Sequence, residues 1–405
     1  MMVEPKLRFK ADNGSDFPDW EEQKIEDVCV LNPRTEQLDD EFYYMDLGSI
    51  DHGRWEAPEI VNKVDAPSRA QRVAAIDDVF FQSVRPYNMG HYHYVAAKDK
   101  QVVASTGYIQ ARMRNGSNAF LYQLFYEERF NAEVNARCTG SNYPAINSRK
   151  FGEITVALPS LPEQRKIADL LSAVDDVIAA QEAEVAAWEK RKKGVMQKLF
   201  SQEVRFKADD GSDFPDWEEK TLGNLGTFLK GAPLSKSDIT DEGTPLILYG
   251  ELYTTYAEVA YSIARRTDKK VPDKFYSKVG DVAIPTSGET PEEISTATCV
   301  MKDGVILAGD LYIYRPATNV DGRILSYLLN HQVNNAISRI AQGKSVVHVH
   351  SKELERIHVI FPSSPIEQRK IADCLASLDD VIAKAKDELD AWCELKKGLL
   401  QQMFV

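Results

Sequence analysis

The sequence EQRKIAD at residues 163–169 occurs again at residues 367–373, and each copy opens a long stretch without proline. Mostly apolar residues then follow at alternating spacings of four and three, over residues 167–199 and 371–403. A period near 3.5 residues held this long is typical of a coiled-coil seam. We therefore expect two long helices that pack on each other, the alternative being that each packs only on its own domain. The seam residues are Ile167, Leu171, Val174, Ile178, Val185, Trp188, Ile371, Leu375, Leu378, Ile382, Leu389 and Trp392.

A second pair of segments shows that the whole chain is duplicated. Residues 8–22 read RFKADNGSDFPDWEE, and residues 205–219 differ from them at a single position. Two copies of about 200 residues indicate two similar halves, because a solenoid needs more and shorter repeats. The sequence thus predicts an α+β protein with two mixed, β-rich domains and two long helices. The expected boundaries are 1–157 for the first domain, 158–203 for the central helix, 204–360 for the second domain and 361–405 for the C-terminal helix.

The regions between the repeated segments look unrelated in sequence but similar in kind. Strands are expected where β-branched and aromatic residues are bounded by Gly, Pro and Asp, at 79–81, 107–112, 245–249 and 311–314. Helices are expected at 119–136 and 323–341. We interpret the two regions as one fold with different surfaces.

Composition limits the possible functions of the chain. It has 405 residues, 43% hydrophobic and 27% charged, which is typical of globular proteins. No run approaches the roughly 20 apolar residues of a membrane helix, and the first ten residues lack an apolar signal core, so we expect a cytoplasmic protein. Five scattered cysteines without a Cys-x-x-Cys pair argue against a disulfide framework and a zinc site. The net charge of −13 disfavours indiscriminate nucleic-acid binding.

The duplicated FPDW segment and the duplicated EQRKIAD helix entry together resemble the specificity subunit of type I restriction-modification systems, over essentially the whole chain. The resemblance implies that each variable region is a target-recognition domain for one half of a bipartite double-stranded DNA target with a non-specific spacer. It implies an antiparallel, pseudo-twofold coiled coil that spaces the domains and docks two methyltransferase subunits, with restriction/translocase subunits joining the complex. S-adenosylmethionine, ATP and Mg would then belong to these partners, and the system would serve DNA methylation and phage defence.

With the ends of the two helices aligned, an antiparallel pair would bring Trp188 near Ile382 and Ile178 near Trp392. The second helix entry carries one extra residue, Ile366, which affects the expected register only slightly.

Local charge gives an independent test of DNA binding. Residues 62–114 hold eight Lys and Arg against four Asp and no Glu, and residues 322–352 and 135–150 hold no acid at all. Acid-free stretches at equivalent places in both halves are expected of a polarised DNA face, although ordinary clustering of charge could also produce them.

Candidate DNA-contacting residues are those whose types suit base edges or phosphates, since Arg reads guanine, Asn reads adenine, and hydroxyls hold phosphates. For each of them, an exposed polar loop residue is the alternative. The candidates are Arg69, Arg72, Arg85, Tyr87, Asn88, Arg112, Ser141, Asn142 and Tyr143 in the first half, and Arg265, Arg266, Thr286, Ser287, Lys344, Ser345 and His348 in the second.

The sequence contains no complete catalytic or metal-binding motif. His91-x-His93 and His348-x-His350 lack a third ligand at a usual spacing, and Gly343-Lys344-Ser345 lacks the glycine that a phosphate loop needs five residues earlier. No methyltransferase or cofactor motif is found, so we expect a non-catalytic chain. Two alternatives stay open: a self-contained DNA-modifying enzyme, which bound S-adenosylmethionine would reveal, and a coiled-coil adaptor that does not read DNA. The recognised bases and the spacer length do not follow from the sequence.

Overall fold

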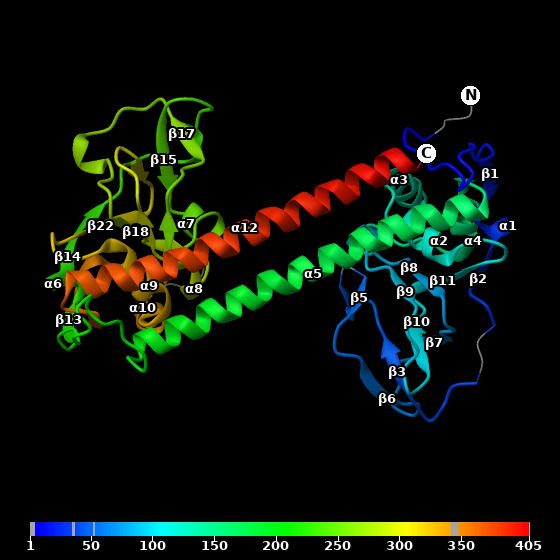
Figure 1. Ribbon diagram of the computed structural model, residues 1–405, viewed down its shortest axis with the longest axis horizontal. Helices are drawn as coiled ribbons and strands as arrows, with labels where there is room; N and C mark the ends of the chain where they lie inside the picture. The colour runs from blue at the N-terminus through cyan, green and yellow to red at the C-terminus, as the bar shows by residue number, and fades with distance from the viewer. Residues whose placement is uncertain (1–4, 35–36, 52, 342–346, 405) are drawn as a thin grey trace. The chain divides into compact units, whose positions relative to one another are not determined.

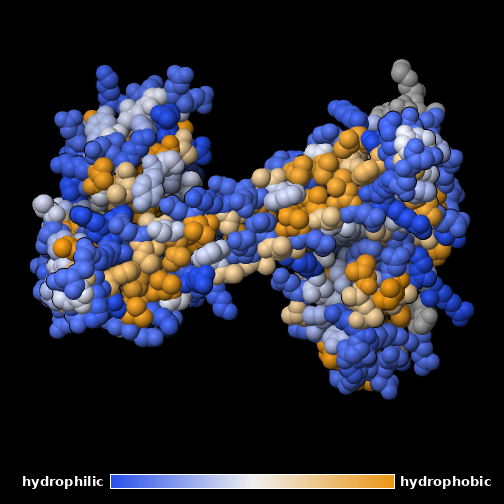
Figure 2. Space-filling view, in the orientation of Figure 1, coloured by the Kyte–Doolittle hydropathy of each residue, from blue (hydrophilic) through white to orange (hydrophobic). Residues whose placement is uncertain are grey.

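The computed structural model describes residues 5–34, 37–51, 53–341 and 347–404. The chain forms two compact units: unit 1 comprises Met1–Glu184 with Ala385–Val405, and unit 2 comprises Val185–Lys384. Each unit therefore combines one variable region with part of both long helices. Across the described ranges, no helix is long and apolar enough to cross a membrane. Hydrophilic side chains cover most of each unit in the view of Figure 2, with hydrophobic patches between them.

The variable region of unit 1 folds into two four-stranded sheets, of strand order β6-β3-β10-β7 and β2-β11-β8-β9, with two smaller sheets, β1-β12 and β4-β5 (Figure 1). Helices α2, α3 and α4 follow the last large-sheet strand. The elements are β1 (Glu21–Lys24), α1 (Ile25–Val28), β2 (Cys29–Leu31), β3 (Glu41–Met45), β4 (Ile50–Asp51), β5 (Arg54–Trp55), β6 (Glu59–Asn62), β7 (Ala70–Val73), β8 (Asp78–Gln82), η1 (Pro86–Asn88), β9 (Tyr92–Tyr94), β10 (Val102–Ser105), β11 (Tyr108–Met113), α2 (Asn118–Leu124), α3 (Glu128–Arg137), α4 (Ser148–Gly152) and β12 (Thr155–Leu158).

Unit 2 contains a five-stranded sheet, β14-β22-β18-β20-β16, a three-stranded sheet, β17-β15-β21, and the pairs β13-β24 and β19-β23. The elements are β13 (Glu218–Thr221), α6 (Leu222–Leu225), β14 (Gly226–Lys230), η2 (Lys236–Asp238), β15 (Thr244–Leu248), α7 (Glu251–Thr254), β16 (Val259–Ala260), β17 (Arg265–Thr267), η3 (Asp273–Phe275), β18 (Asp281–Pro285), β19 (Ser287–Gly288), α8 (Pro291–Ile294), β20 (Thr298–Val300), β21 (Ile306–Ala308), β22 (Leu311–Pro316), α9 (Gly322–His331), α10 (Asn334–Ile340), β23 (Val347–His348), α11 (Ser351–Leu354) and β24 (His358–Phe361).

The two variable regions share one topology, as their sequence pattern predicts. Strand β11 pairs antiparallel with β2 and β8, and β22 pairs antiparallel with β14 and β18. Strand β10 runs parallel to β3, and β21 runs parallel to β15. The α+β fold class with two similar, β-rich domains is therefore confirmed, although almost no sequence identity was visible between these regions.

The expected helix at 119–136 is in fact two helices, α2 and α3. The chain leaves α2 at Phe125, and the Glu127 carboxylate then accepts hydrogen bonds from the N–H groups of Arg129 and Phe130. This N-terminal cap favours a new helix start over a continuous helix. The second half repeats the break between α9 and α10, at residues 332–333.

The two long helices lie within the segments expected for them, 158–203 and 361–405. Helix α5 spans Leu161–Phe200 (40 residues) and helix α12 spans Pro365–Met403 (39 residues), so each is about 60 Å long at 1.5 Å per residue. Pro162 and Pro365 lie in the first turns of these helices. Proline is tolerated there because the first N–H groups of a helix have no intrahelical acceptor.

Within each unit, the two long helices run antiparallel. In unit 1, Lys396 Nζ lies 2.5 Å from Asp175 Oδ1. In unit 2, Lys192 Nζ lies 2.5 Å from Asp379 Oδ1. In an antiparallel pair that aligns residue 192 with 379, residue 188 lies opposite 383, beside Ile382. The same counting from Lys396 places residue 178 opposite 393, beside Trp392, so the ion pairs agree with the expected register to one residue.

The seam residues do not all serve the pairing of the two helices with each other. All twelve are buried or half-buried. Ile167 and Leu171 join a core that contains Trp20 of the repeated segment, Phe120 of the variable region and Phe404 directly after α12. In unit 2, a core shared with the variable region contains Ile371 and Leu375 together with the end of α5. The first turns of each helix thus pack on their own domain as well as on the other helix.

The repeated segments are explained by their contacts with each other. The Arg8 guanidinium binds both carboxylate oxygens of the fully buried Glu163, at 3.0 and 2.9 Å. Arg205 binds Glu367 at the same two distances. Lys166 Nζ donates to the carbonyl of Lys10 at 3.0 Å. Glutamate and lysine of EQRKIAD therefore hold the RFKAD segment against the helix entry, so this part of the repeat is a structural clamp.

The glutamine of EQRKIAD connects the start of the long helix to the start of another helix in the same domain. Gln164 Nε2 donates to the Pro159 carbonyl, and its Oε1 accepts from the N–H of Ser117 at the start of α2. Gln368 makes the equivalent contacts with Pro362 and Asp321, at the start of α9.

Candidate nucleic-acid interface

The first group of candidates lies on two loops that the fold brings together. One loop, residues 83–90, follows β8, and the other, residues 138–146, links α3 to α4. Val84 and Ala145 form an isolated β-bridge. The Arg85 N–H donates to the Pro144 carbonyl at 2.7 Å, and the Ile146 N–H donates to the Ser83 carbonyl at 3.0 Å. We call this arrangement loop pair 1.

Loop pair 1 gathers six of the sequence candidates on an exposed surface. The Arg85 guanidinium carbon lies 4.3 Å from the centre of the Tyr143 ring, a cation–π contact. The Tyr87 and Tyr143 side chains are 55% and 65% exposed. Asn88, Ser141 and Asn142 are also exposed. Exposed aromatic rings beside a guanidinium and amide groups are suited to stack on bases and to read base edges.

The backbone of loop pair 1 holds an unusual conformation. Arg85 and Met89, on either side of the short η1 helix, have φ angles of +52° and +53°. A left-handed conformation costs a non-glycine residue about 1–2 kcal/mol, so the surrounding structure must maintain it. Buried Gln82 does so: its Oε1 accepts from the Gly90 N–H at 2.9 Å, and its Nε2 donates to the Val84 carbonyl at 2.9 Å. Strain of this kind is concentrated at functional sites.

The two histidines after loop pair 1 lie in different surroundings. His91 is completely buried and stacks on Phe81, with its ring centre 4.3 Å from the phenyl centre. Burial lowers the pKa of His91 to about 3, and its Nδ1 accepts a hydrogen bond from the Gln82 N–H. His93 instead contacts the Asp77 carboxylate at 2.7 Å. His91 therefore supports loop pair 1 from within the core, whereas His93 contacts Asp77, so each histidine supports a different part of the domain.

The second group of candidates lies on the equivalent loops of unit 2. Strand β19, directly after β18, pairs with β23, so that Ser287 faces His348. The Val349 N–H donates to the Thr286 carbonyl at 3.1 Å. We call this arrangement loop pair 2. His348 is exposed, whereas Thr286 and Ser287 are buried, with 9% and 4% exposure. Thr286 and Ser287 are therefore better placed to hold the loop in position than to contact a ligand.

Lys344 and Ser345 lie outside the described residues.

The remaining basic candidates differ in how far they are used inside the fold. Arg112 Nε lies 2.7 Å from the buried Asp78 carboxylate, and Arg315 makes the same pair with Asp281 in unit 2. Arg72 Nε donates to the Tyr108 carbonyl at 2.8 Å. These contacts give Arg112 and Arg72 a structural role that their sequence context did not reveal.

Three further arginines are exposed. Arg265 pairs with Glu251 at 3.0 Å, and Arg266 donates to the Gly243 carbonyl at 3.1 Å. Arg69 has an exposed side chain.

Sequence reasoning missed a cavity in unit 2. It is lined by the segment after β14, the segment after β15 and the turn before β22, and it encloses about 1080 Å³. Its lysines and tyrosines lie in the variable region of the second half, where the sequence does not repeat, so neither the repeat nor a charge run marked them.

Comparisons with known proteins agree on one family. The family model described as "Type I restriction modification DNA specificity domain" matches residues 18–187 and 215–391. The "Putative type I restriction enzyme MjaX specificity subunit" of Methanocaldococcus jannaschii is 28% identical over 276 residues, covering 64% of this chain and 60% of that protein. The MjaVIII specificity subunit of the same organism is 22% identical over 320 residues, covering 74% of this chain and 73% of that protein.

Solved structures share the fold. The S subunit of the type I restriction-modification system from M. genitalium superposes with a TM-score of 0.63 at 16% identity, covering 100% of this chain and 99% of that one. A chain from the structure "Structural basis underlying complex assembly and conformational transition of the type I R-M system" gives a TM-score of 0.55 at 21% identity, covering 95% and 97%. At these identities the likeness shows the fold alone.

Proposed function

The chain belongs to the type I restriction-modification DNA specificity family, and from this membership we propose that it reads a bipartite DNA target. In this proposal loop pair 1 contacts one half-site and loop pair 2, with the adjoining surface, contacts the other, separated by a spacer whose bases are not read. The long helices dock two methyltransferase subunits, and restriction/translocase subunits join through them. The chain itself catalyses no reaction and works in the cytoplasm.

The observation that carries the proposal is the pairing of a repeated scaffold with loops that differ. In unit 1, the end of β8 meets the loop that precedes α4 through the β-bridge of Val84 with Ala145. In unit 2, the end of β18 meets the loop that precedes α11 through the pair of Ser287 with His348. The clamp residues are identical in the two halves, whereas the loops share almost no residues. One scaffold carrying two unlike loop pairs is expected of a protein that reads two unlike half-sites.

The partners supply the chemistry in this proposal. S-adenosylmethionine would bind the methyltransferase subunits, and ATP and Mg would bind the restriction subunits. The described residues contain no group of three or more His, Cys, Asp or Glu side chains that could hold a metal.

The deciding experiment exchanges one variable region and reads the methylated sequence. The chain would be co-expressed with its methyltransferase subunit, and genome-wide methylation sequencing would identify the target. Replacing residues 30–157 with the first variable region of another family member should change one half-site and leave the other half-site unchanged. Loss of both half-specificities in a folded, assembled chimera would contradict the modular proposal.

A point variant tests loop pair 1 within that design. The double substitution Y87A/Y143A should weaken binding to the target duplex by about 2–6 kcal/mol if each ring stacks on one base. Y261A is the control, because Tyr261 is 53% exposed but lies in unit 2, away from both loop pairs in sequence. Equal binding by Y87A/Y143A and Y261A would exclude base stacking on loop pair 1.

A further inference from the structure

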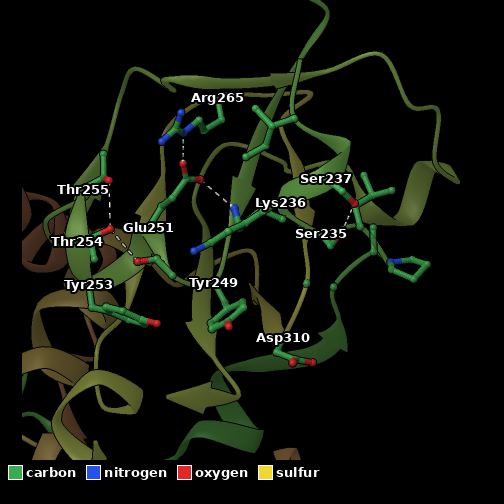
Figure 3. A pocket seen from close by; sticks show the side chains of 18 of the residues that line it. Ser235, Lys236, Ser237, Tyr249, Glu251, Tyr253, Thr254, Thr255, Arg265 and Asp310 are labelled. Atoms are coloured by element: carbon green, nitrogen blue, oxygen red, sulfur yellow. Dashed lines mark hydrogen bonds and ion pairs between the residues drawn. The ribbon is translucent and has the colours of Figure 1, made fainter. Parts of the chain in front are cut away.

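The cavity of unit 2 is built from three segments. Lys230 ends β14, and residues 231–237 after it form one wall. Residues 248–251 and 253–255, from the end of β15 through α7, form another wall. Gly309 and Asp310 close it at the turn before β22. Figure 3 shows Lys236, Tyr249 and Tyr253 facing the same space.

The charges at this cavity are only partly neutralised within the chain. Glu251 accepts hydrogen bonds from Arg265 Nε and from the Leu248 N–H, each at 3.0 Å, so its carboxylate is already occupied. Lys230 and Lys236 are exposed, and no ion-pair partner for either exists among the described residues. Two ammonium groups therefore face the cavity without a counter-charge of their own, in a chain whose net charge is −13.

Polar and aromatic groups complete a lining suited to nucleotides. The Ser235 and Ser237 hydroxyls lie 2.8 Å apart on one wall. Thr254 and Thr255 lie on the opposite wall, where Tyr249 and Tyr253 supply two rings (Figure 3). Hydroxyls and ammonium groups hold phosphates, and phenol rings pack against sugars and bases.

One backbone hydrogen bond links the wall of the cavity to loop pair 2. The Thr286 N–H, at the start of that loop pair, donates to the Asp310 carbonyl at 2.8 Å. The Asp310 side chain is exposed at the cavity, and no ion-pair partner for it is found in the part of the chain that the structure describes. A carboxylate in this position can accept a hydrogen bond from the N4 amino group of cytosine.

We propose that this cavity receives the DNA strand of the second half-site, with Lys230 and Lys236 on its phosphates and Asp310 on an exocyclic amino group of a base. The inference rests on the proposed function, because it takes duplex DNA as the ligand. It goes further by naming residues that distinguish the second half-site from the first. The cavity residues belong to the unrepeated part of the chain, where residues that read different half-sites must lie.

The test measures the salt dependence of DNA binding by the chain assembled with its methyltransferase subunits. The probe is a duplex that carries the target read from methylation sequencing. Each phosphate contact contributes about 0.9 to the slope of log K against log salt, so K230A/K236A should lower the slope by about 1.8 and the affinity by roughly 60-fold at about 0.1 M salt. Both side chains are exposed, so the variant is expected to fold.

The matched control also removes two lysine charges from the variable region of unit 2. It does so near the start of β18, whereas loop pair 2 follows the end of that strand. Lys278 and Lys302 are exposed, and Lys278 precedes β18 whereas Thr286 follows it. K278A/K302A should leave the slope within the error of the unsubstituted complex. If both double variants lowered the slope equally, or neither did, the cavity would not hold the DNA backbone.

Two further measurements separate this inference from its alternatives. D310N should relax the methylated sequence at one position of the second half-site and leave the first half-site unchanged; an unchanged sequence would overturn the role of Asp310. Binding of AMP by the chain that K230A/K236A abolishes, with DNA binding intact, would make the cavity a small-ligand site and overturn the proposal. If the unsubstituted complex methylates no defined sequence, the proposed function fails first, so the two failures are distinct.

Discussion

Removing the charge of Lys192 should destabilise the helix pair more than removing any other single charge. Its Nζ atom lies 2.8 Å from Glu258 Oε2 and 2.5 Å from Asp379 Oδ1, and its side chain is 11% exposed. The same ammonium lies 5.3 Å from the centre of the Tyr327 ring, whose hydroxyl donates to Asp379 at 2.5 Å. Substitution K192M keeps the aliphatic stem but leaves two carboxylates without their shared cation.

The duplication supplies a matched control for this substitution. Lys396 is the equivalent of Lys192, and it pairs with Asp175 at 2.5 Å and lies 4.9 Å from the centre of the Tyr126 ring. Asp175 is 32% exposed, and Gln123 donates a further hydrogen bond to it at 2.8 Å. K396M therefore leaves a single carboxylate without its cation, and this carboxylate is better hydrated and still hydrogen-bonded. K192M instead leaves two poorly hydrated carboxylates.

The expected free energies follow from this difference. Breaking a buried ion pair by removing one partner costs about 3–5 kcal/mol, whereas a largely exposed pair contributes about 0–1 kcal/mol. K192M should therefore lower the free energy of unfolding of unit 2 by about 3–5 kcal/mol at neutral pH. K396M should lower that of unit 1 by about 1 kcal/mol, because its pair is intermediate in exposure.

The pH dependence of K192M has a definite sign. Burial raises the pKa of Glu258, but the hydrogen bond from His331 and the charge of Lys192 outweigh it and lower that pKa to about 2, from an ordinary 4.5. A lowered carboxyl pKa contributes stability above pH 4.5 that is lost as the pH falls towards 2. Removing Lys192 removes part of this contribution. The difference between the unsubstituted chain and K192M should therefore narrow as the pH falls through this range.

Hydrogen exchange is the suitable assay, because it reports each unit separately. Amides of α9 and of the first turns of α12 report on unit 2, and amides of α2 and the first turns of α5 report on unit 1. The reasoning would be refuted if K192M and K396M destabilised their units equally, or if the effect of K192M grew as the pH fell.

Three further outcomes are expected. E163Q and E367Q should each lower the unfolding free energy of their unit by about 3 kcal/mol in urea titrations, because each leaves a clamp arginine without its buried carboxylate partner; a cost well below 1 kcal/mol for both would show that the clamps are dispensable. G194A should stabilise α5 by about 1 kcal/mol in thermal unfolding, since an added Cβ meets nothing within 4 Å, and destabilisation would contradict this. A four-residue insertion after Ala180 adds about 6 Å of helix and nearly preserves the seam; methylation sequencing should find the same half-sites with a wider spacer, and an unchanged spacer in an active variant would exclude the helix as the ruler.

Prediction of individual contact residues was less complete than prediction of the fold. The six candidates of loop pair 1 do come together, because the strand end at Val84 pairs with Ala145 across about 60 residues of sequence. Arg112 was chosen for its charge, yet its guanidinium binds buried Asp78. Thr286 and Ser287 were chosen for their hydroxyls and are buried. Residue type alone does not show whether a polar group is already bound inside the fold.

The sequence by itself determined the duplication and the two long helices. Each of these depends on local information: a repeat is visible as letters, and a helical seam is visible as a period of 3.5 residues. Only the tertiary structure decided which charges face outward, which loops meet, and that Lys230, Tyr249 and Asp310 share one cavity. These features join residues far apart in the chain, and their positions are set by how β14, β15 and β22 pack, which no local pattern of residues encodes.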